Sequence, residues 1–415
     1  MRCFTHAMLG VFALACFIAI SAVAGAVNAS DGSEYLISDD FAIGRAGQGC
    51  LESEVSETFG AAGGYAPGGP CTCDACTKRH CPPGQPGLVQ NLLACKDRCW
   101  IGRFDSLLLW RSAPSSRPLF TTFNAATKAI GPVALDANRL DSDPLAAPRI
   151  SLFRPDGCGY AREVTYLYAG NFYGDRSLPP VFQGYAVASP GIYGNPWGDQ
   201  PGAPPLTTVD AKLLSSLQSL EFNARTPFLW DMAQFLFGFR WVQWQEQLTM
   251  AEQFSDADFP SIRGSGLYDT SCVNDLYGGQ IGIDSLLLTT ASGLRFEGLV
   301  KAGVFYNAAV QSSSYSYSYS TTPPFTFNKG IRVGQSPAGA SFVGEVGLTG
   351  VIPFRRNWDF RFGYFGLWIE GIAQQSNQLS GQDLTQPEIV PATGSLTAAG
   401  GVLVHGLSLG LEGRW

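Results

Sequence analysis

The sequence predicts an all-β protein: a closed antiparallel up-and-down transmembrane β-barrel of about 10 strands (range 8–12), preceded by a Cys-rich irregular periplasmic segment. Three observations favour this fold. Apolar and polar residues alternate with a period of two in many segments. No stretch after the N-terminal region approaches the roughly 18–20 apolar residues of a membrane helix. The links between candidate strands alternate between long and short.

The composition excludes several classes of protein. The formal net charge is -7 and Lys and Arg form no long cluster, which argues against a nucleic-acid partner. Hydrophobic residues make up 45% of the chain, enough apolar surface for an ordered fold. Only three His are present, so the sequence offers little material for imidazole chemistry or for a cofactor site.

Residues 1–29 are predicted to be a signal peptide for export. Arg2 and His6 precede an apolar run, and small residues follow it, with cleavage expected after Ala29 or, alternatively, after Ala26. Cys16 suggests lipidation, but Ala13, Leu14 and Ala15 form a poor lipobox. A retained anchor helix is the other alternative. The remaining chain divides into a periplasmic segment, 30–100, and a barrel domain, 101–415.

The barrel strands are predicted from the alternation of apolar and polar residues. Near the C-terminus, Leu407, Leu409 and Leu411 face one side, and Ser408, Gly410 and Glu412 face the other. The ten candidate strands span residues 102–111, 147–154, 161–170, 215–224, 234–250, 276–288, 293–308, 341–352, 358–372 and 402–415. Alternation alone would also suit a secreted soluble β-sandwich.

The links separate these two folds. The links after odd-numbered strands are long: 112–146, 171–214, 251–275, 309–340 and 373–401. The links after even-numbered strands are short: 155–160, 225–233, 289–292 and 353–357. An up-and-down barrel with short periplasmic turns and long outer loops has this alternation of short and long links. Two points are weak: Arg149 to Phe153 alternates poorly, and Val181 to Ala188 is an extra candidate strand.

Charges on the polar faces are predicted to point into the lumen. They are Arg240, Arg295, Glu297, Lys301, Glu345, Arg361, Glu412 and Arg414. They would form either a selectivity ring or a salt-bridged plug. Barrels of about eight strands are filled by their own side chains, whereas general porins have 16 to 18 strands, so we expect a narrow or closed lumen.

Four segments carry a resemblance to a known family. They are Phe235 to Gln247 (FLFGFRWVQWQEQ), Asn274 to Gly282 (NDLYGGQIG), Arg361 to Gly371 (RFGYFGLWIEG) and His405 to Trp415 (HGLSLGLEGRW). They resemble the outer-membrane β-barrel family expanded in planctomycete bacteria, over roughly residues 100 to 415. The resemblance implies a location in the cell outer membrane and a barrel architecture, but no activity, cofactor or catalytic residue. The Cys-rich head and the Ser/Tyr loop depart from it.

The periplasmic segment is rich in Gly, Pro and Cys. With Cys158 in a predicted periplasmic turn, the disulfide candidates are Cys50, Cys71, Cys73, Cys76, Cys81, Cys95, Cys99 and Cys158. In an oxidising compartment such thiols usually form disulfides, although CTCDACTKRHC also has the spacing of a zinc site. We hypothesise that Cys158 tethers the head under the barrel mouth. Cys272 lies in a predicted outer loop and is expected to stay unpaired.

Catalysis has little support in the sequence. His405 is predicted to face lipid on the last strand, where a Ser partner would suggest an acyl-ester hydrolase, but no Ser can be aligned with it. The run SSSYSYSYS at residues 312–320 suits either an adhesive aromatic surface or a strand that continues beyond the membrane. We therefore expect no enzymatic activity.

Three functions fit the sequence. The first is a structural or surface-display barrel acting through its long extracellular loops. The second is a small selective channel that uses the inward charges, and the third is a soluble β-sandwich binding protein. Expected partners are outer-membrane lipid and the barrel-assembly machinery, through the C-terminal strand ending in Trp415; no extracellular ligand is identified.

Overall fold

The structure is a computed structural model of the 415-residue chain. It describes residues 100–124, 129–155, 160–181, 185–187, 206–228, 232–255, 263–320, 325–334, 339–378, 382–383, 393–394 and 396–415. Residues 1–99 and Cys158 lie outside these ranges, and with them the predicted signal peptide, the Cys-rich segment and all eight disulfide candidates. Among the described residues, no helix has the length and the apolar composition needed to cross a membrane.

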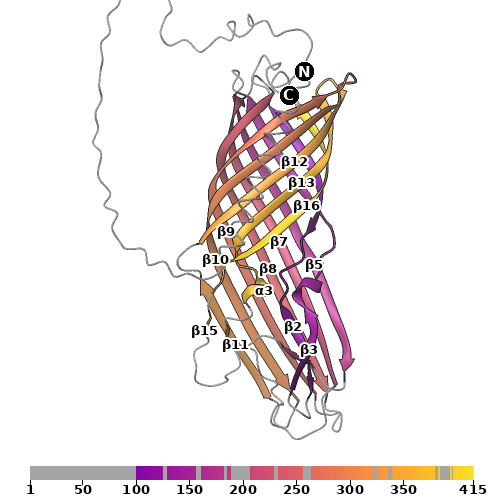
Figure 1. Ribbon diagram of the computed structural model, residues 1–415, viewed down its shortest axis with the longest axis vertical. Helices are drawn as coiled ribbons and strands as arrows, with labels where there is room; N and C mark the ends of the chain where they lie inside the picture. The colour runs from indigo at the N-terminus through magenta and orange to yellow at the C-terminus, as the bar shows by residue number, and fades with distance from the viewer. Residues whose placement is uncertain are drawn as a thin grey trace, which may run out of the picture. The chain divides into compact units, whose positions relative to one another are not determined.

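Ten antiparallel strands close into a barrel (Figure 1). In ring order they are β1 (Ile101–Arg111), β4 (Leu145–Pro155), β5 (Ala161–Val181), β7 (Leu206–Phe228), β8 (Ala233–Ser255), β9 (Arg263–Thr289), β10 (Arg295–Tyr319), β12 (Gly339–Arg355), β13 (Trp358–Ile372) and β16 (Gly400–Arg414). The pairing of β1 with β16 completes the ring, and Trp100 and Trp415 exchange two backbone hydrogen bonds at this seam. The predicted fold and strand number are confirmed, and the soluble-sandwich alternative is wrong because the sheet closes on itself.

The two faces of the barrel wall differ as the alternation predicts. On β16, Leu407, Leu409 and Leu411 are exposed on the outside, while Ser408 and Glu412 are buried inside. Exposed apolar side chains on other strands include Phe104, Leu108, Ile150, Leu152, Val164, Phe222, Phe237, Phe239, Ile281, Val304, Leu348, Ile352 and Phe360. An apolar outer surface of this kind is stable in contact with hydrocarbon. A closed barrel also satisfies the backbone hydrogen bonds that lipid cannot make.

Several strands are longer than the sequence predicted. β5, β7, β8, β9 and β10 have 21 to 27 residues, whereas a membrane strand needs about 9–11. The extra residues lie in the predicted long links 171–214, 251–275 and 309–340, which are therefore largely strand. In Figure 1 these strands continue past the barrel at the end opposite the C-terminus. Together they form a wall that we call the outer extension.

The outer face of this extension is polar where the barrel surface is apolar. Gln243 donates a hydrogen bond to Asp275 (2.9 Å), and Gln247 donates one to Asp269 (2.9 Å), all on the outer face of β8 and β9. Such amide and carboxylate groups are not stable in hydrocarbon. The outer surface of β8 therefore leaves the membrane beyond Trp241, the aromatic residue that precedes Gln243 on the same face.

The inner face of the extension is covered by the link between β1 and β4. This link contains β2 (Pro118–Asn124) and β3 (Ala129–Asp136), which form a small sheet with β6 (Tyr185–Val187). Leu119, Phe120, Leu135, Ala137 and Leu140 of the link pack against Val209, Ala211, Leu213, Leu248, Met250 and Tyr268 of the wall. The extra strand expected near 181–188 thus exists as β6, but it pairs with β2 and is not part of the barrel.

The Ser/Tyr run belongs to β10, which continues to Tyr319. Its backbone pairs with β9 on one side and with β11 (Phe325–Gly334) on the other. The run is therefore a strand that continues beyond the membrane, the second of the two interpretations of its sequence.

Candidate functional site: the barrel interior

The part of the interior nearest the short turns is filled by charged side chains. Nine cations and nine anions of the described interior pair with one another, and the Arg111–Glu246 pair lies farther from the short turns than the rest. They are Arg103, Arg111, Arg149, Arg225, Arg240, Arg295, Lys301, Arg361 and Arg414, and Asp105, Glu163, Glu221, Glu246, Asp284, Glu297, Glu345, Asp359 and Glu412. Each belongs to at least one ion pair with another member of this set. The formal charge of this set is zero.

The central pairs cross the lumen. Arg240 of β8 contacts Glu345 of β12 (2.8 Å) and Glu221 of β7 (3.5 Å). Lys301 of β10 contacts the same two carboxylates, at 2.8 Å to Glu221 and 3.3 Å to Glu345. Two cations and two anions therefore form a closed square that links the neighbouring strands β7 and β8 with β10 and β12, across β9.

A second cluster lies towards the short-turn end. Arg361 of β13 contacts Glu297 (3.2 Å) and Glu412 (3.1 Å), and Arg103 of β1 also contacts Glu412 (2.7 Å). Arg414 pairs with Asp359 and Glu412. The charged side chains of this cluster come from several strands and each contacts more than one partner or is held by a neighbour that does. Such a network holds buried charges in place more firmly than an isolated ion pair does.

Arg225 forms the third cluster, between β5, β7 and β9. Its guanidinium contacts Glu163 and Asp284, each at 2.7 Å. The same guanidinium lies over the ring of Phe153, at 5.1 Å from the centroid. On the neighbouring part of the wall, Arg149 donates to Asp105 at 2.8 Å.

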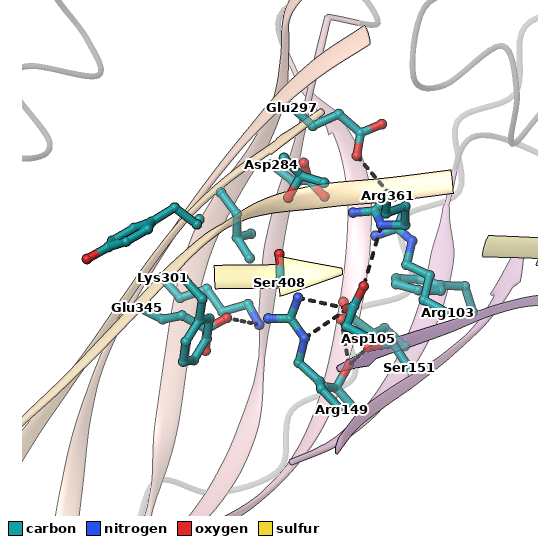
Figure 2. Close-up of a pocket in the computed structure, with 18 of the residues that line it drawn as sticks. Arg103, Asp105, Arg149, Ser151, Asp284, Glu297, Lys301, Glu345, Arg361 and Ser408 are labelled. Atoms are coloured by element: carbon teal, nitrogen blue, oxygen red, sulfur yellow. Dashed lines mark hydrogen bonds and ion pairs between the residues drawn. The ribbon is translucent and has the colours of Figure 1, made fainter. Parts of the chain in front are cut away.

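A small cavity remains between these clusters (Figure 2). Its volume is about 50 Å³, and Figure 2 shows Arg149, Asp105 and Arg361 converging on one side, with Lys301 and Glu345 on the other. A volume of this size accommodates a few water molecules, whereas ordinary ligand pockets have about 300–1,000 Å³.

All eight charges named from the sequence are in this network. Arg240, Arg295, Glu297, Lys301, Glu345, Arg361 and Glu412 are buried, and the Arg414 side chain is 17% exposed. Ten further members were not among the candidates: Arg103, Asp105, Arg111, Arg149, Glu163, Glu221, Arg225, Glu246, Asp284 and Asp359. Asp105 and Glu221 lie on the polar face of predicted strands, so the alternation already contained the signal for them.

An apolar layer fills the interior beyond the charged region. It comprises Leu107, Leu109, Ala147, Leu167, Ala169, Phe172, Leu217, Val242, Trp244, Leu276, Phe305, Val343, Phe365, Leu367, Ile369, Ile372, Val402 and Val404. Trp244 is fully buried in it, with the Phe172 ring at 6.4 Å and the Arg111 guanidinium at 5.5 Å. This layer was not predicted, since its members occupy the inward positions that the alternation assigns to polar residues.

The link between β13 and β16 enters the barrel above the apolar layer. Its first residues, including the single-turn helix α3 (Gln375–Gln378), are buried against β8 and β9. Glu246 receives hydrogen bonds there from Arg111 (2.5 Å) and from the backbone N–H of Gln375 (3.0 Å). The interior is therefore occupied at three successive levels.

Two other residues named from the sequence lie outside the network: His405 faces outward as predicted, whereas Cys272 is not in the predicted loop. His405 lies on the outer face of β16, where its Nδ1 is 2.7 Å from the Tyr364 hydroxyl and its ring stacks on Trp110. Cys272 lies within β9 and not in a loop; it is fully buried and is the free cysteine among the described residues. The reason is the unpredicted length of β9, which carries residue 272 into the outer extension.

Among the comparisons with known proteins, one family model matches the chain. The family described as "Putative beta barrel porin-7 (BBP7)" matches residues 204–415, just over half of the chain. No curated protein matches significantly. Among solved structures, the chain is similar to a Pseudomonas aeruginosa FadL homologue (8% identity, 77% of this chain and 90% of that chain, TM-score 0.19).

Two further solved structures have comparable scores. They are the toluene transporter TbuX of Ralstonia pickettii (9% identity, 77% and 89% covered, TM-score 0.19) and an anion-selective porin from Comamonas acidovorans (9% identity, 76% and 98% covered, TM-score 0.15). TM-scores this low support no conclusion about function. The family match and the closed ten-stranded barrel together identify the protein as a member of the BBP7 family of β-barrel porins, located in the outer membrane.

Proposed function

We propose that the protein is a structural or surface-display barrel whose lumen does not conduct solutes at rest. The observation that carries the proposal is the filling of the interior at three levels: the charged network, the apolar layer and the segment that contains α3. A general diffusion pore needs a continuous aqueous path, and wide paths occur in barrels of about 16–18 strands.

The outer extension supplies the surface on which such a protein would act. Porin-type barrels place their short turns in the periplasm and their long connections outside the cell. By that rule the extension and the β2–β3–β6 sheet are extracellular. The barrel then serves as the anchor, and the extracellular ligand is unidentified.

Partners follow from the same arrangement. The apolar outer belt contacts outer-membrane lipid, and β16 with Trp415 is the strand that the barrel-assembly machinery would recognise. No nucleic-acid partner, cofactor or enzymatic activity is part of the proposal. The proposal also includes the resemblance to a family expanded in planctomycete bacteria and the disulfides of the periplasmic segment. Both are supported by the amino-acid sequence alone.

Planar-bilayer recording of the refolded full-length protein tests the closed lumen. A general porin of 16 strands, reconstituted in the same way, is the positive control. We expect no stable steps in the nanosiemens range, because each of the three layers interrupts the path. Steady nanosiemens steps at single-molecule dilution would contradict the closed lumen.

A small selective channel is the second candidate. The cavity favours it, because its volume accommodates a few water molecules and its lining is charged. Recording at higher gain distinguishes it, since a selective channel gives small steps with a reversal potential displaced in a salt gradient. Equal numbers of lumen cations and anions argue against strong selectivity for either sign. A displaced reversal potential would support the channel over the anchor.

A further inference from the structure

The chain turns into the barrel directly after β13. Gly371 has φ +77°, a conformation that L side chains rarely adopt, and a Cβ at this position would lie 2.8 Å from the Ala340 carbonyl oxygen. Ile372 and Ala373, the next two residues, have no exposed surface. We call residues Gly371–Gln378 the cap.

Polar contacts from five wall strands hold the cap. Ser341 of β12 donates to the Gly371 carbonyl (2.7 Å), Gln374 donates to the Gly401 carbonyl of β16 (2.6 Å), and the others come from β8, β9 and β10. Asn274 of β9 donates to the Ala373 carbonyl (2.9 Å) and accepts from the Ala373 N–H (2.8 Å). Asn307 of β10 donates to the Gly371 carbonyl (3.0 Å). Gln375 donates its backbone N–H to the Glu246 carboxylate of β8 (3.0 Å) and its side-chain amide to the Glu246 carbonyl (3.1 Å).

Buried polar atoms on and around the cap make no hydrogen bond to another described side chain or backbone group. They include Oε1 of Gln375 in the cap and Oδ1 of Asn307 and Oε1 of Gln311 on β10. A buried polar atom without a hydrogen bond destabilises the arrangement that buries it, so these atoms lower the cost of displacing the cap.

The wall beneath the cap does not depend on it. β8, β9 and β10 pair continuously through Glu246, Asn274 and Asn307, with no irregularity of register near them. Within the cap, Ile372 pairs with Gly400 of β16, whereas the single-turn helix is not paired with β8, β9 or β10. Displacing the cap would therefore break this one pairing and leave the backbone pairing of β8, β9 and β10 intact.

Cys272 reports directly on the position of the cap. Its side chain is fully buried in a cluster with Ala309 of β10, Ala373 of the cap and Leu396 of the same link. Burial also raises the pKa of the thiol, which lowers its reactivity further while the cap is in place.

From these contacts we propose that the cap is displaceable: it leaves the interior as one piece, hinged at Gly371, and opens the extracellular half of the lumen down to the apolar layer. Asn274 is the principal latch, because it holds the cap backbone through both a donor and an acceptor. The opened space has a polar wall and an apolar floor that includes Trp244 and Phe305. This opening is separate from conduction, since the charged network below remains.

The experiment measures alkylation of Cys272 by a maleimide in refolded full-length protein, read by peptide mass spectrometry so that other cysteines do not contribute. Asn274→Ala should accelerate labelling at least tenfold, equivalent to about 1.4 kcal/mol. Gln375→Ala changes only the cap and should also accelerate labelling, by a smaller factor. It keeps the test informative if Asn274→Ala does not fold.

Asn223→Ala is the matched control. Asn223 is a buried asparagine on β7 that hydrogen-bonds Glu221 and Gln280 in the charged network, away from the cap. Its replacement should leave Cys272 labelling at the wild-type rate. Unchanged labelling in both cap variants overturns the proposal, as does equal acceleration in the control, which would indicate general loosening. Bilayer conductance of the same variants is scored separately, because the closed lumen can fail while the cap result stands.

Discussion

Arg240 and Glu345 meet across the lumen, with Nη1 of the guanidinium 2.8 Å from Oε2 of the carboxylate, although β9 and β10 separate their strands in the sheet. Both side chains are almost fully buried. The pair therefore connects two parts of the wall that share no backbone hydrogen bonds, and both members are shielded from bulk solvent.

Replacing Arg240 alone should destabilise the barrel strongly. Arg240→Leu leaves Lys301 as the one cation that contacts Glu221 and Glu345 among the described residues, and breaking a buried pair on one side costs about 3–5 kcal/mol. The double variant Arg240→Leu/Glu345→Leu should recover much of that loss. Urea unfolding in lipid vesicles, followed by heat-modifiable electrophoretic mobility, measures both. Equal stability of the single and double variants would argue that the two residues do not interact.

A charge on the outer belt should destabilise the protein according to its depth. Leu409 is 58% exposed on the outer face of β16, where hydrocarbon covers it, so Leu409→Arg should cost about 2–4 kcal/mol if the residue is near the midplane. Ala251→Arg lies on the outer face of the extension and should change stability little. The same unfolding assay compares them, and a similar loss in both variants would contradict the position of the membrane.

Lys212 tests the orientation of the barrel. It is exposed on β7 in the outer extension, whereas Lys301 is buried in the lumen. A membrane-impermeant amine reagent added to intact cells should modify Lys212 and leave Lys301 unmodified, as read by peptide mass spectrometry. Modification of Lys212 only after the cells are broken would place the extension in the periplasm.

Glu252 should make the outer extension less stable as pH rises. Its register neighbours, Val209 and Gly266, carry no charge, and burial raises the pKa of its carboxyl to about 7 from an ordinary value of 4.5. The folded state then holds the proton more tightly than the unfolded state, so this stabilisation is complete below pH 4.5 and is lost as pH rises through about 7.

Amide exchange along residues 249–253, corrected for intrinsic rates, measures this effect. Exchange should be faster at pH 8 than at pH 5.5 in the wild type. In Glu252→Gln, which cannot ionise, the difference should disappear. A difference of the same size in both proteins would assign the pH dependence to another group.

The strands that touch lipid could be predicted from the sequence, because hydrocarbon on one face and the barrel interior on the other impose an alternation with a period of two. Leu407, Leu409 and Leu411 must face hydrocarbon while Ser408 and Glu412 face the barrel interior, and the short turns fix where each strand begins or ends. At the outer end this constraint changes. Met250 and Leu213 point inward, where the alternation predicts polar residues, but the β2–β3 link covers them, and only the folded structure reveals that cover.

The sequence predicted inward-facing charges but missed many members of the charged network, and it did not predict the cap. Charges such as Arg225 and Asp284 belong to the network through partners on other strands, and those pairings depend on the register of the sheet. The cap depends on Asn274 and Asn307, which are unremarkable polar residues in the sequence until the fold brings a distant backbone within hydrogen-bonding distance.

The outer extension rises from only part of the circumference. β5, β7, β8, β9 and β10 form it, whereas β13 ends at Ile372, β16 begins at Gly400 and β1 ends at Arg111. The barrel is therefore asymmetric about the membrane normal. A neighbouring membrane protein that diffuses in the bilayer meets the polar wall of the extension from one direction and the ends of the shorter strands from the other. Its encounters with the barrel therefore depend on the direction of approach before any specific contact forms.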